Sequence, residues 1–166
     1  NGKGACYHCH RDAETSNAAI TNGGNSKAFA NIGVRPIRES RGLRRGEHKS
    51  VGIRNAELTN PYLWNGSELT LRQLVRFYNK GGKFRGGRNE LDPLGLTNRE
   101  ERDLVSFMLA LTDDRVRCDA EQFDHPSLPL WFGDDLPAVG TDGLQQCWKP
   151  ALDDGSRNFH YKLRIR

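Results

Sequence analysis

The chain has 166 residues, of which 36% are hydrophobic, and its 18 glycines and 7 prolines indicate many turns. A chain of this length is expected to form one domain, or one small domain with an appendage. The formal net charge is only +4, which does not indicate a nucleic-acid-binding protein. No apolar run approaches the length that a helix needs to span a membrane.

A haem-attachment motif lies close to the start of the sequence. Cys6, Cys9 and His10 form the pattern C-x-x-C-H, which is typical of covalently attached c-type haem. In such a site the two thiols add to the haem vinyl groups, and the histidine binds the iron. A thioredoxin-like dithiol would need a βαβ context, and a zinc site would need a second close cysteine pair. The sequence offers neither, because Cys118 and Cys147 are far apart.

The motif also predicts where the protein is found. Bacterial c-type haem is attached outside the cytoplasm, so we expect a periplasmic or otherwise extracytoplasmic protein whose signal peptide has been removed. In an oxidising compartment two further cysteines usually pair, and we expect a disulfide between Cys118 and Cys147. Such a bridge would close a loop of about 30 residues and stabilise the fold by roughly 3–4 kcal/mol. Two free buried thiols are the alternative.

Residues 12–56 are rich in Gly, Asn, Ser and Arg, and we expect them to be irregular. They include two basic clusters, at 35–38 and 41–45. A solvated loop is one interpretation of these clusters. A cover over the haem propionates, or a docking face for an acidic redox partner, is the other.

Two amphipathic helices are predicted next. Thr70 and Gln73 have the spacing of a capping box, and a glycine pair at 81–82 ends the first helix. Its apolar stripe consists of Leu71, Leu74, Val75 and Tyr78. Thr97 and Glu100 begin a second helix in the same way, ahead of apolar residues at 104, 105, 108, 109 and 111.

Prolines and glycines interrupt short apolar stretches in residues 117–166. We expect an extended tail that wraps the domain or a partner, with Trp131, Phe132 and Trp148 as its anchors. The fold class is therefore mainly α. It consists of a cytochrome c-like haem domain over residues 1–116, with long irregular loops, followed by this tail over residues 117–166.

The residue that binds the iron opposite His10 determines the properties of the haem. Met108 lies in mid-helix on an apolar stripe, where packing against the haem is its expected role. Tyr78 lies on the inward stripe of its helix, so its hydroxyl needs a partner. The iron would satisfy that need, and so would a propionate or a backbone carbonyl. On this pattern Tyr78 is therefore either an iron ligand or a core tyrosine, and both interpretations stay open. Weaker candidates are the histidines outside the motif, His48, His125 and His160.

A series of short stretches carries a family resemblance. They are FANIGVRP at 29–36, VGIRN at 51–55, LTNPY at 58–62, NG at 65–66, TL at 70–71, YNKGG at 78–82, LGLT at 94–97, LTD at 111–113 and FDHP at 123–126. Together with C-x-x-C-H, and in the same order, they resemble the C-terminal haem domain of the bacterial di-haem cytochrome c peroxidase and MauG family. Trp64 departs from the pattern, since the family commonly has histidine there.

The resemblance implies a set of site residues. The haem would be six-coordinate, with the distal ligand on the helix after the Thr-x-Pro segment. Peroxidases have methionine there and the MauG branch has tyrosine. Aligning Thr70 and Leu71 with the start of the family's helix puts Tyr78 at this position. A calcium ion between two haem domains would be held here by the backbone carbonyls of Thr59 and Pro61, a donor type that suits a hard cation. Arg54 would lie beside a propionate.

The resemblance also implies a function. The chain would be the electron-transfer haem domain of a di-haem peroxidase-like or MauG-like oxidoreductase, carrying oxidising equivalents to or from a peroxide-reactive haem on another segment. We expect that another chain or segment supplies this second haem and the helix that usually precedes the motif. A redox partner protein is also expected. The alternative is a mono-haem electron-relay subunit of a larger redox complex.

Overall fold

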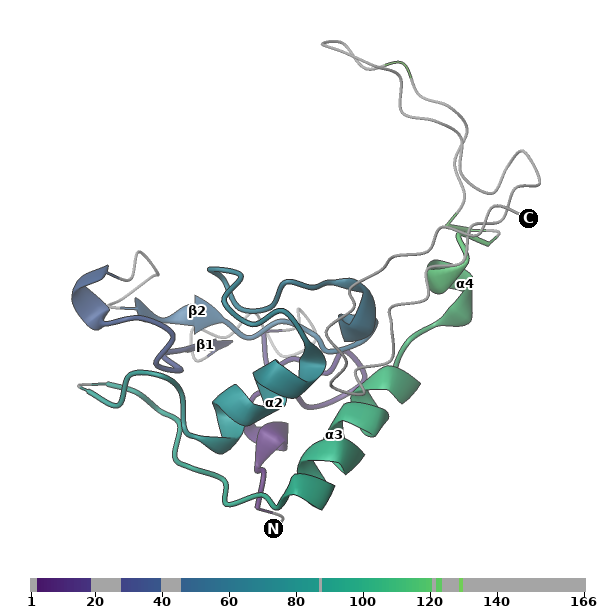
Figure 1. Cartoon of the computed structure of the whole chain (residues 1–166). Helices are drawn as coiled ribbons and strands as arrows, with labels where there is room; N and C mark the ends of the chain where they lie inside the picture. Colours follow the sequence, from purple (N-terminus) through teal and green to yellow (C-terminus); the bar gives the residue numbers. More distant parts are fainter. Residues whose placement is uncertain are drawn as a thin grey trace. The chain divides into compact units, whose positions relative to one another are not determined.

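The computed structural model of the chain describes residues 3–18, 28–39, 46–86, 88–120, 122–123 and 129. The chain divides into two units, Asn1–Leu111 and Thr112–Arg166 (Figure 1). The haem motif and both predicted helices lie in the first unit. The second begins with the short helix α4 (Asp114–Arg117). The expected tail anchors Trp131, Phe132 and Trp148, with His125 and His160, lie outside the described residues.

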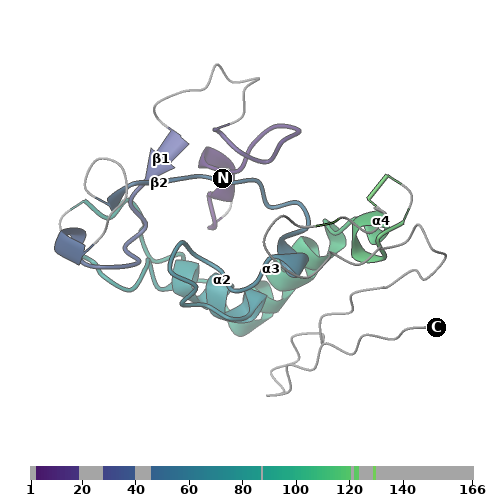
Figure 2. The same cartoon turned by 90° about the horizontal axis from the view of Figure 1, so that it is seen from above.

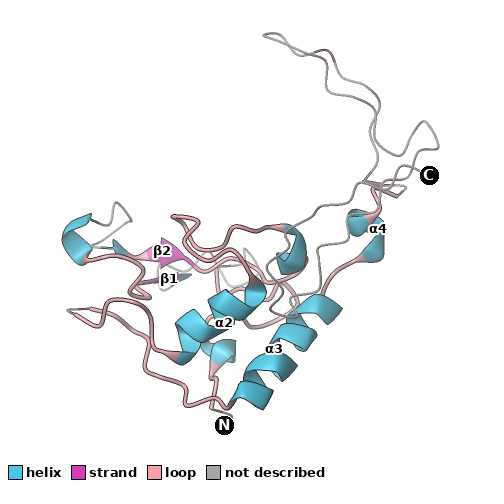
Figure 3. Ribbon diagram, viewed as in Figure 1, coloured by secondary structure: helices cyan, strands magenta, loops and turns pink. Residues whose placement is uncertain are grey.

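The described part of the first unit is mostly helical, with long irregular segments between its elements (Figure 3). Its helices are α2 (Leu71–Asn79) and α3 (Asn98–Ala110). The 3-10 turns are η1 (Cys6–His8), η4 (Ile37–Glu39) and η5 (Ala56–Leu58). The prediction of a mainly helical fold with irregular loops is therefore confirmed. No helix among the described residues has both the length and the apolar character of a membrane span.

Both helices begin at the predicted capping boxes. The Thr70 hydroxyl accepts a hydrogen bond from Gln73 N at 3.0 Å, and the Gln73 side chain accepts from Thr70 N at 3.1 Å. Thr97 and Glu100 repeat this exchange at 3.3 and 2.8 Å. These reciprocal bonds satisfy N–H groups that have no partner within the helix. Both helix starts are therefore where the sequence predicts them.

The core of the first unit forms where α2 packs against α3. Met108 is 8% exposed and lies in this core, whereas its expected packing against a haem stays a prediction. Phe77, which the predicted apolar stripe of α2 left out, is also buried. The buried cluster between the helices consists of Tyr62, Leu71, Val75, Val105 and Met108.

The segment expected to be irregular contains a small antiparallel sheet. Strand β1 (Phe29–Ala30) pairs with β2 (His48–Lys49), and Phe29 lies opposite Lys49. Two-residue strands are too short to show the alternation that identifies a strand in a sequence. For that reason the sequence pattern does not predict them.

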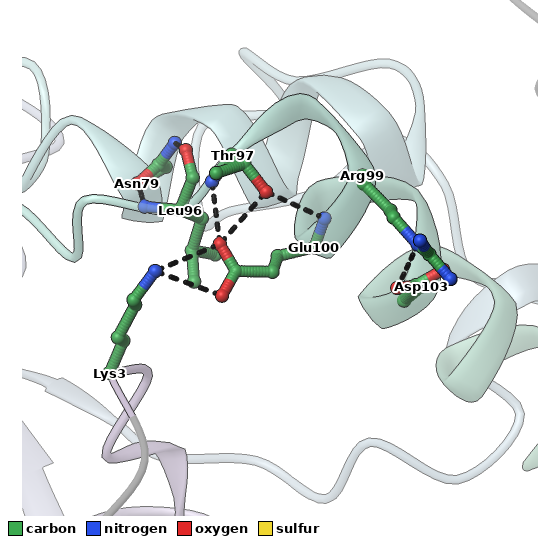
Figure 4. Close-up of polar contacts among 7 residues, drawn as sticks. All are labelled: Lys3, Asn79, Leu96, Thr97, Arg99, Glu100 and Asp103. Carbon is green, nitrogen blue, oxygen red and sulfur yellow. Dashed lines mark hydrogen bonds and ion pairs between the residues drawn. The ribbon is translucent and has the colours of Figure 1, made fainter.

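The start of α3 is tied to the residues just ahead of the haem motif. Lys3 Nζ lies 3.0 and 3.2 Å from the two carboxylate oxygens of Glu100 (Figure 4). The hydrogen bond from Thr97 N, together with those from Lys3 and the Thr97 hydroxyl, lowers the pKa of Glu100 from 4.5 to about 2. Glu100 thus caps α3 and holds the N-terminal segment with the same carboxylate.

This depressed pKa predicts an acid dependence of stability. The contribution of the Glu100 carboxylate to the free energy of unfolding is complete above about pH 4.5 and disappears as the pH falls through about 2. We therefore expect Glu100→Gln to be less stable than the wild type at pH 7 and equally stable near pH 2. Thermal denaturation followed by circular dichroism at several pH values measures the difference.

The control for this experiment is Asp103→Asn on the same helix. Asp103 lies 3.9 Å from Arg99, and both side chains are exposed, so its replacement should have little effect at any pH. If the stability difference between the wild type and Glu100→Gln stayed constant between pH 7 and pH 2, the charge of Glu100 would not be the cause of that difference.

Candidate haem site

The haem motif folds into a tight turn that presents both thiols on one side. Cys9 N and His10 N donate hydrogen bonds to the Cys6 carbonyl at 3.2 and 2.8 Å. Side chains three residues apart eclipse one another in a 3-10 turn, so the two sulfurs lie close together. Partial loss of solvent around its sulfur raises the pKa of Cys6, and the neighbouring Cys9 also raises it. Both thiols are free.

The loop after the motif is fastened at both of its ends. Asn17 N donates to the Cys9 carbonyl at 2.8 Å, and the Asn17 side-chain amide donates to the His8 carbonyl at 3.4 Å. The Ser16 hydroxyl donates to the Ser50 carbonyl at 2.6 Å. The attachment turn is therefore held against the segment that follows β2.

The ring of His10 is oriented for binding through one specific nitrogen. His10 Nδ1 lies 3.1 Å from the Thr15 carbonyl oxygen. A carbonyl can only accept a hydrogen bond, so Nδ1 must carry the proton, and the neutral ring keeps its lone pair on Nε2. Metal-binding histidines are commonly held in this way by a bond from their second nitrogen. His10 therefore has the tautomer that an iron ligand requires.

Thr15 holds this orientation with an unusual backbone conformation. Its φ is +51°, which is uncommon for a residue branched at Cβ. Its hydroxyl also accepts a hydrogen bond from Ile53 N at 3.0 Å. The side chain of Thr15 thus anchors the same residue whose carbonyl orients His10.

Removing the hydroxyl of Thr15 is expected to weaken this anchor. Thr15→Val keeps the shape but leaves Ile53 N without its acceptor, which should lower the free energy of unfolding by about 1 kcal/mol. Thr15→Ser keeps the hydroxyl and serves as the matched control. Urea denaturation measures both variants. A Thr15→Val variant as stable as the wild type would show that the hydrogen bond from Ile53 N does not stabilise the fold.

Tyr78 lies in the last turn of α2 and is half-buried. Burial raises the pKa of its phenol to about 12, and the thiols of Cys9 and Cys6 contribute to this rise. This influence places the phenol and the two sulfurs in the same part of the first unit. Figure 2 shows η1 and α2 on opposite sides of the middle of the first unit. The phenol is neutral at pH 7, and a bound metal cation would be needed to hold it as phenolate.

These residues fit a covalently attached haem. They offer two free thiols on one turn, an imidazole with Nε2 available and, on α2, the half-buried phenol of Tyr78. Tyrosine is an established haem ligand, and its hydroxyl needs a partner when buried. Among the described residues there is no group of three or more His, Cys, Asp or Glu side chains that could hold another metal.

Three further predicted residues lie in the connection between β2 and α2. Arg54 is exposed and precedes Asn55, whose φ is +56°. Thr59 and Pro61 are exposed and flank Asn60, which forms a cis peptide bond with Pro61. The predicted calcium donors thus belong to one turn, but calcium binding and the contact of Arg54 with a propionate stay predictions.

The remaining candidates lie elsewhere. The His48 ring is stacked on Trp64, with ring centroids 4.8 Å apart and planes tilted by 12°. Partial burial lowers the pKa of His48. Trp64, the departure from the family pattern, therefore has an aromatic partner. Cys118 is disulfide-bonded, but Cys147 lies outside the described residues, so their pairing stays a prediction.

Curated relatives match part of this sequence. Cytochrome-c peroxidase IdrP1 of Denitromonas iodatirespirans is 38% identical over 87 residues, which cover 51% of this chain and 22% of the relative. IdrP2 of the same organism is 42% identical over 77 residues, or 46% of this chain and 19% of the relative. In Pseudomonas sp. (strain SCT), the cytochrome-c peroxidase IdrP1 is 34% identical over 85 residues, 51% of this chain and 21% of its own length. The chain thus spans about a fifth of these relatives.

No family model matches the sequence. A solved structure is similar to the structure of this chain, namely that of a MauG-like protein associated with microbial copper homeostasis. Its TM-score is 0.56 at 23% identity, over 73% of this chain and 46% of that one. A likeness at this identity shows a shared fold. The resemblance seen in the sequence is confirmed to this extent: over about half of its length the chain is homologous to cytochrome-c peroxidases, and it shares the fold of part of a MauG-like protein.

Proposed function

We propose that this chain is the electron-transfer haem domain of a di-haem peroxidase-like or MauG-like oxidoreductase. The observation that carries the proposal is Tyr78, a half-buried tyrosine in the last turn of α2 whose phenol is near enough to the Cys9 and Cys6 thiols for them to raise its pKa. The tautomer of His10 supports it, because the iron-binding nitrogen is left free. The relatives are cytochrome-c peroxidases, which agrees with redox chemistry at a haem. A bound haem would supply one-electron transfer.

Each residue of the site has a distinct role in this proposal. Cys6 and Cys9 would hold the haem through thioether bonds, each S–H having added across a vinyl C=C. His10 would bind the iron through Nε2, and its bond to the Thr15 carbonyl would strengthen it as a donor. Tyr78 would bind the iron as phenolate, which favours the ferric state. Met108 packs in the core beside α2.

The remaining parts of the proposal concern the surroundings of the domain. Peroxide would react at a second haem on another segment, and this domain would carry oxidising equivalents to or from it. The carbonyls of Thr59 and Pro61 would bind calcium next to that segment, and Arg54 would lie beside a propionate. Because c-type haem is attached outside the cytoplasm, the protein would be periplasmic or otherwise extracytoplasmic.

The test is a haem count on the full-length product, made in a bacterial host that attaches c-type haem. Native mass spectrometry gives the number of haems and the segments that carry them, and oxidation of a reduced donor protein by hydrogen peroxide gives the activity. We expect one haem on this domain, a second on another segment, and peroxide-dependent turnover.

Other results would change the assignment. A single haem and no peroxide turnover would favour the alternative, a mono-haem electron-relay subunit. In the wild type the covalently attached haem should stay on the polypeptide after denaturation. In the double variant Cys6→Ala and Cys9→Ala it should not. Absence of covalent haem on this domain in the wild type would reject both assignments.

A further inference from the structure

Glu101 is a carboxylate buried between the two helices of the first unit. It lies on α3 and is 6% exposed. Its Oε2 accepts from Arg76 Nε at 3.3 Å, and its Oε1 accepts from Asn79 Nδ2 at 2.8 Å. Both partners belong to α2. A buried charge is tolerated only when it is well paired, and Glu101 is paired at both of its oxygens.

Asn79 extends this connection to a third segment. Its Oδ1 accepts from Leu96 N at 2.8 Å, and its Nδ2 also donates to the Leu96 carbonyl at 3.0 Å (Figure 4). Its main-chain carbonyl accepts from Leu94 N at 3.1 Å. The side chain thus uses its acceptor and both of its donor hydrogens. The last residue of α2 is fixed to α3 and to the chain that leads into α3.

The candidate iron ligand directly precedes this fixed point. Tyr78 and Asn79 are consecutive in the last turn of α2, and Arg76 lies one turn before Asn79 on the same face. Any rotation of this turn about the helix axis would stretch the bonds of Asn79 and Arg76 to Glu101. The same rotation would move the phenol oxygen further than the backbone, because that oxygen lies far from the axis.

We propose that Glu101 is a positioning residue for Tyr78: through Asn79 and Arg76 it fixes the rotation of the last turn of α2 and so holds the phenol opposite His10. The inference rests on the proposed function, since it takes Tyr78 as the haem ligand. Groups at a functional site must be held to within about 0.5 Å. A buried ion pair is weak evidence for stability but can select one geometry.

The test measures the ferric holoprotein by absorption and resonance Raman spectroscopy, which detect iron-bound tyrosinate. Glu101→Met keeps the length of the side chain and removes both acceptors. We expect it to lose more than about half of the tyrosinate-to-iron absorption at a temperature where circular dichroism shows a folded protein, because a ligand displaced by about 1 Å no longer bonds well. Glu101→Gln keeps an acceptor for Asn79 and should retain most of the absorption.

Asp103→Asn is the matched control, because Asp103 is an exposed carboxylate of the same helix that pairs with Arg99. It should leave the spectrum unchanged.

A Glu101→Met protein with a lower melting temperature but full tyrosinate absorption would overturn the inference and leave Glu101 with a packing role only. If Glu101→Met does not fold, Arg76→Met is the second variant. It removes one partner of Glu101, and the Arg76 side chain is 46% exposed. A partial loss of absorption in that variant supports the inference, and an unchanged spectrum overturns it.

Failure of the proposed function can be distinguished from failure of the positioning role of Glu101. If the wild type has a covalent haem but no tyrosinate signature, and Tyr78→Phe leaves its spectrum unchanged, Tyr78 is not the ligand and the inference falls with it. If Tyr78→Phe abolishes the signature while Glu101→Met preserves it, only the positioning role of Glu101 is rejected.

Discussion

Replacing Tyr78 by methionine is expected to raise the reduction potential of the holoprotein by on the order of several hundred millivolts. Phenolate is a charged oxygen donor that favours ferric iron, whereas the thioether of methionine favours the ferrous state and raises the potential. Axial ligands set haem potentials over a range of roughly 0.8 V, so an exchange between these two donors should be among the largest single changes. Spectroelectrochemical titration of the ferric and ferrous forms measures it.

Tyr62 provides the control for this experiment. It is also buried, but its hydroxyl donates to the Ala56 carbonyl at 2.9 Å. Tyr62→Phe should lower stability by about 1 kcal/mol and leave the potential unchanged. Tyr78→Phe should remove the tyrosinate absorption. If Tyr78→Met and Tyr78→Phe both kept the potential of the wild type, the phenol would not bind the iron.

The residues of the candidate haem site divide into those that a sequence can identify and those that it cannot. Cys6, Cys9 and His10 follow from a motif whose spacing is set by the chemistry of attachment. Tyr78 was left open by its helical stripe, and the family resemblance singled it out. Thr15 has no such signal, because its role depends on a backbone φ of +51° and on a carbonyl that any residue could supply.

Helix boundaries were predictable because their signals are local. The capping boxes at Thr70 and Thr97 are complete within four residues of sequence, and the structure contains both. The β1–β2 pair was not predictable, since its two strands are separated by many residues and are too short to show a period. What depends on contacts between distant segments therefore had to come from the structure.

Glu100 and Glu101 illustrate this difference within two residues. In the sequence both are acidic residues in the first turn of a helix, where carboxylates favour the helix dipole. In the structure Glu100 is part of the capping box and pairs with Lys3 at the surface. Glu101 is buried against Arg76 and Asn79. Only packing against α2 gives Glu101 a role that its neighbour does not have.

The glycine after α2 is predicted to be among the least replaceable residues of the first unit. Gly82 has a φ of +81°, and a Cβ at this position would collide with the Ile32 carbonyl oxygen. Gly82 N also donates to the Phe77 carbonyl at 3.0 Å, which closes the last turn of α2. Gly82→Ala would combine an unfavourable backbone conformation, costing about 1–2 kcal/mol, with this collision against the backbone. We expect a total loss above about 3 kcal/mol in urea denaturation.

Two other glycines separate these contributions. Gly95 has a φ of +66°, but a Cβ there would have no atom within 4 Å, and Gly86 has open space without that backbone conformation. Gly95→Ala should therefore show the backbone cost alone, and Gly86→Ala should be close to neutral. A loss in Gly82→Ala no greater than that in Gly95→Ala would mean that Ile32 gives way easily. A larger loss would show that segment 31–34 supports the turn that carries Tyr78, so that the proposed haem ligand has a second support besides the one proposed for Glu101.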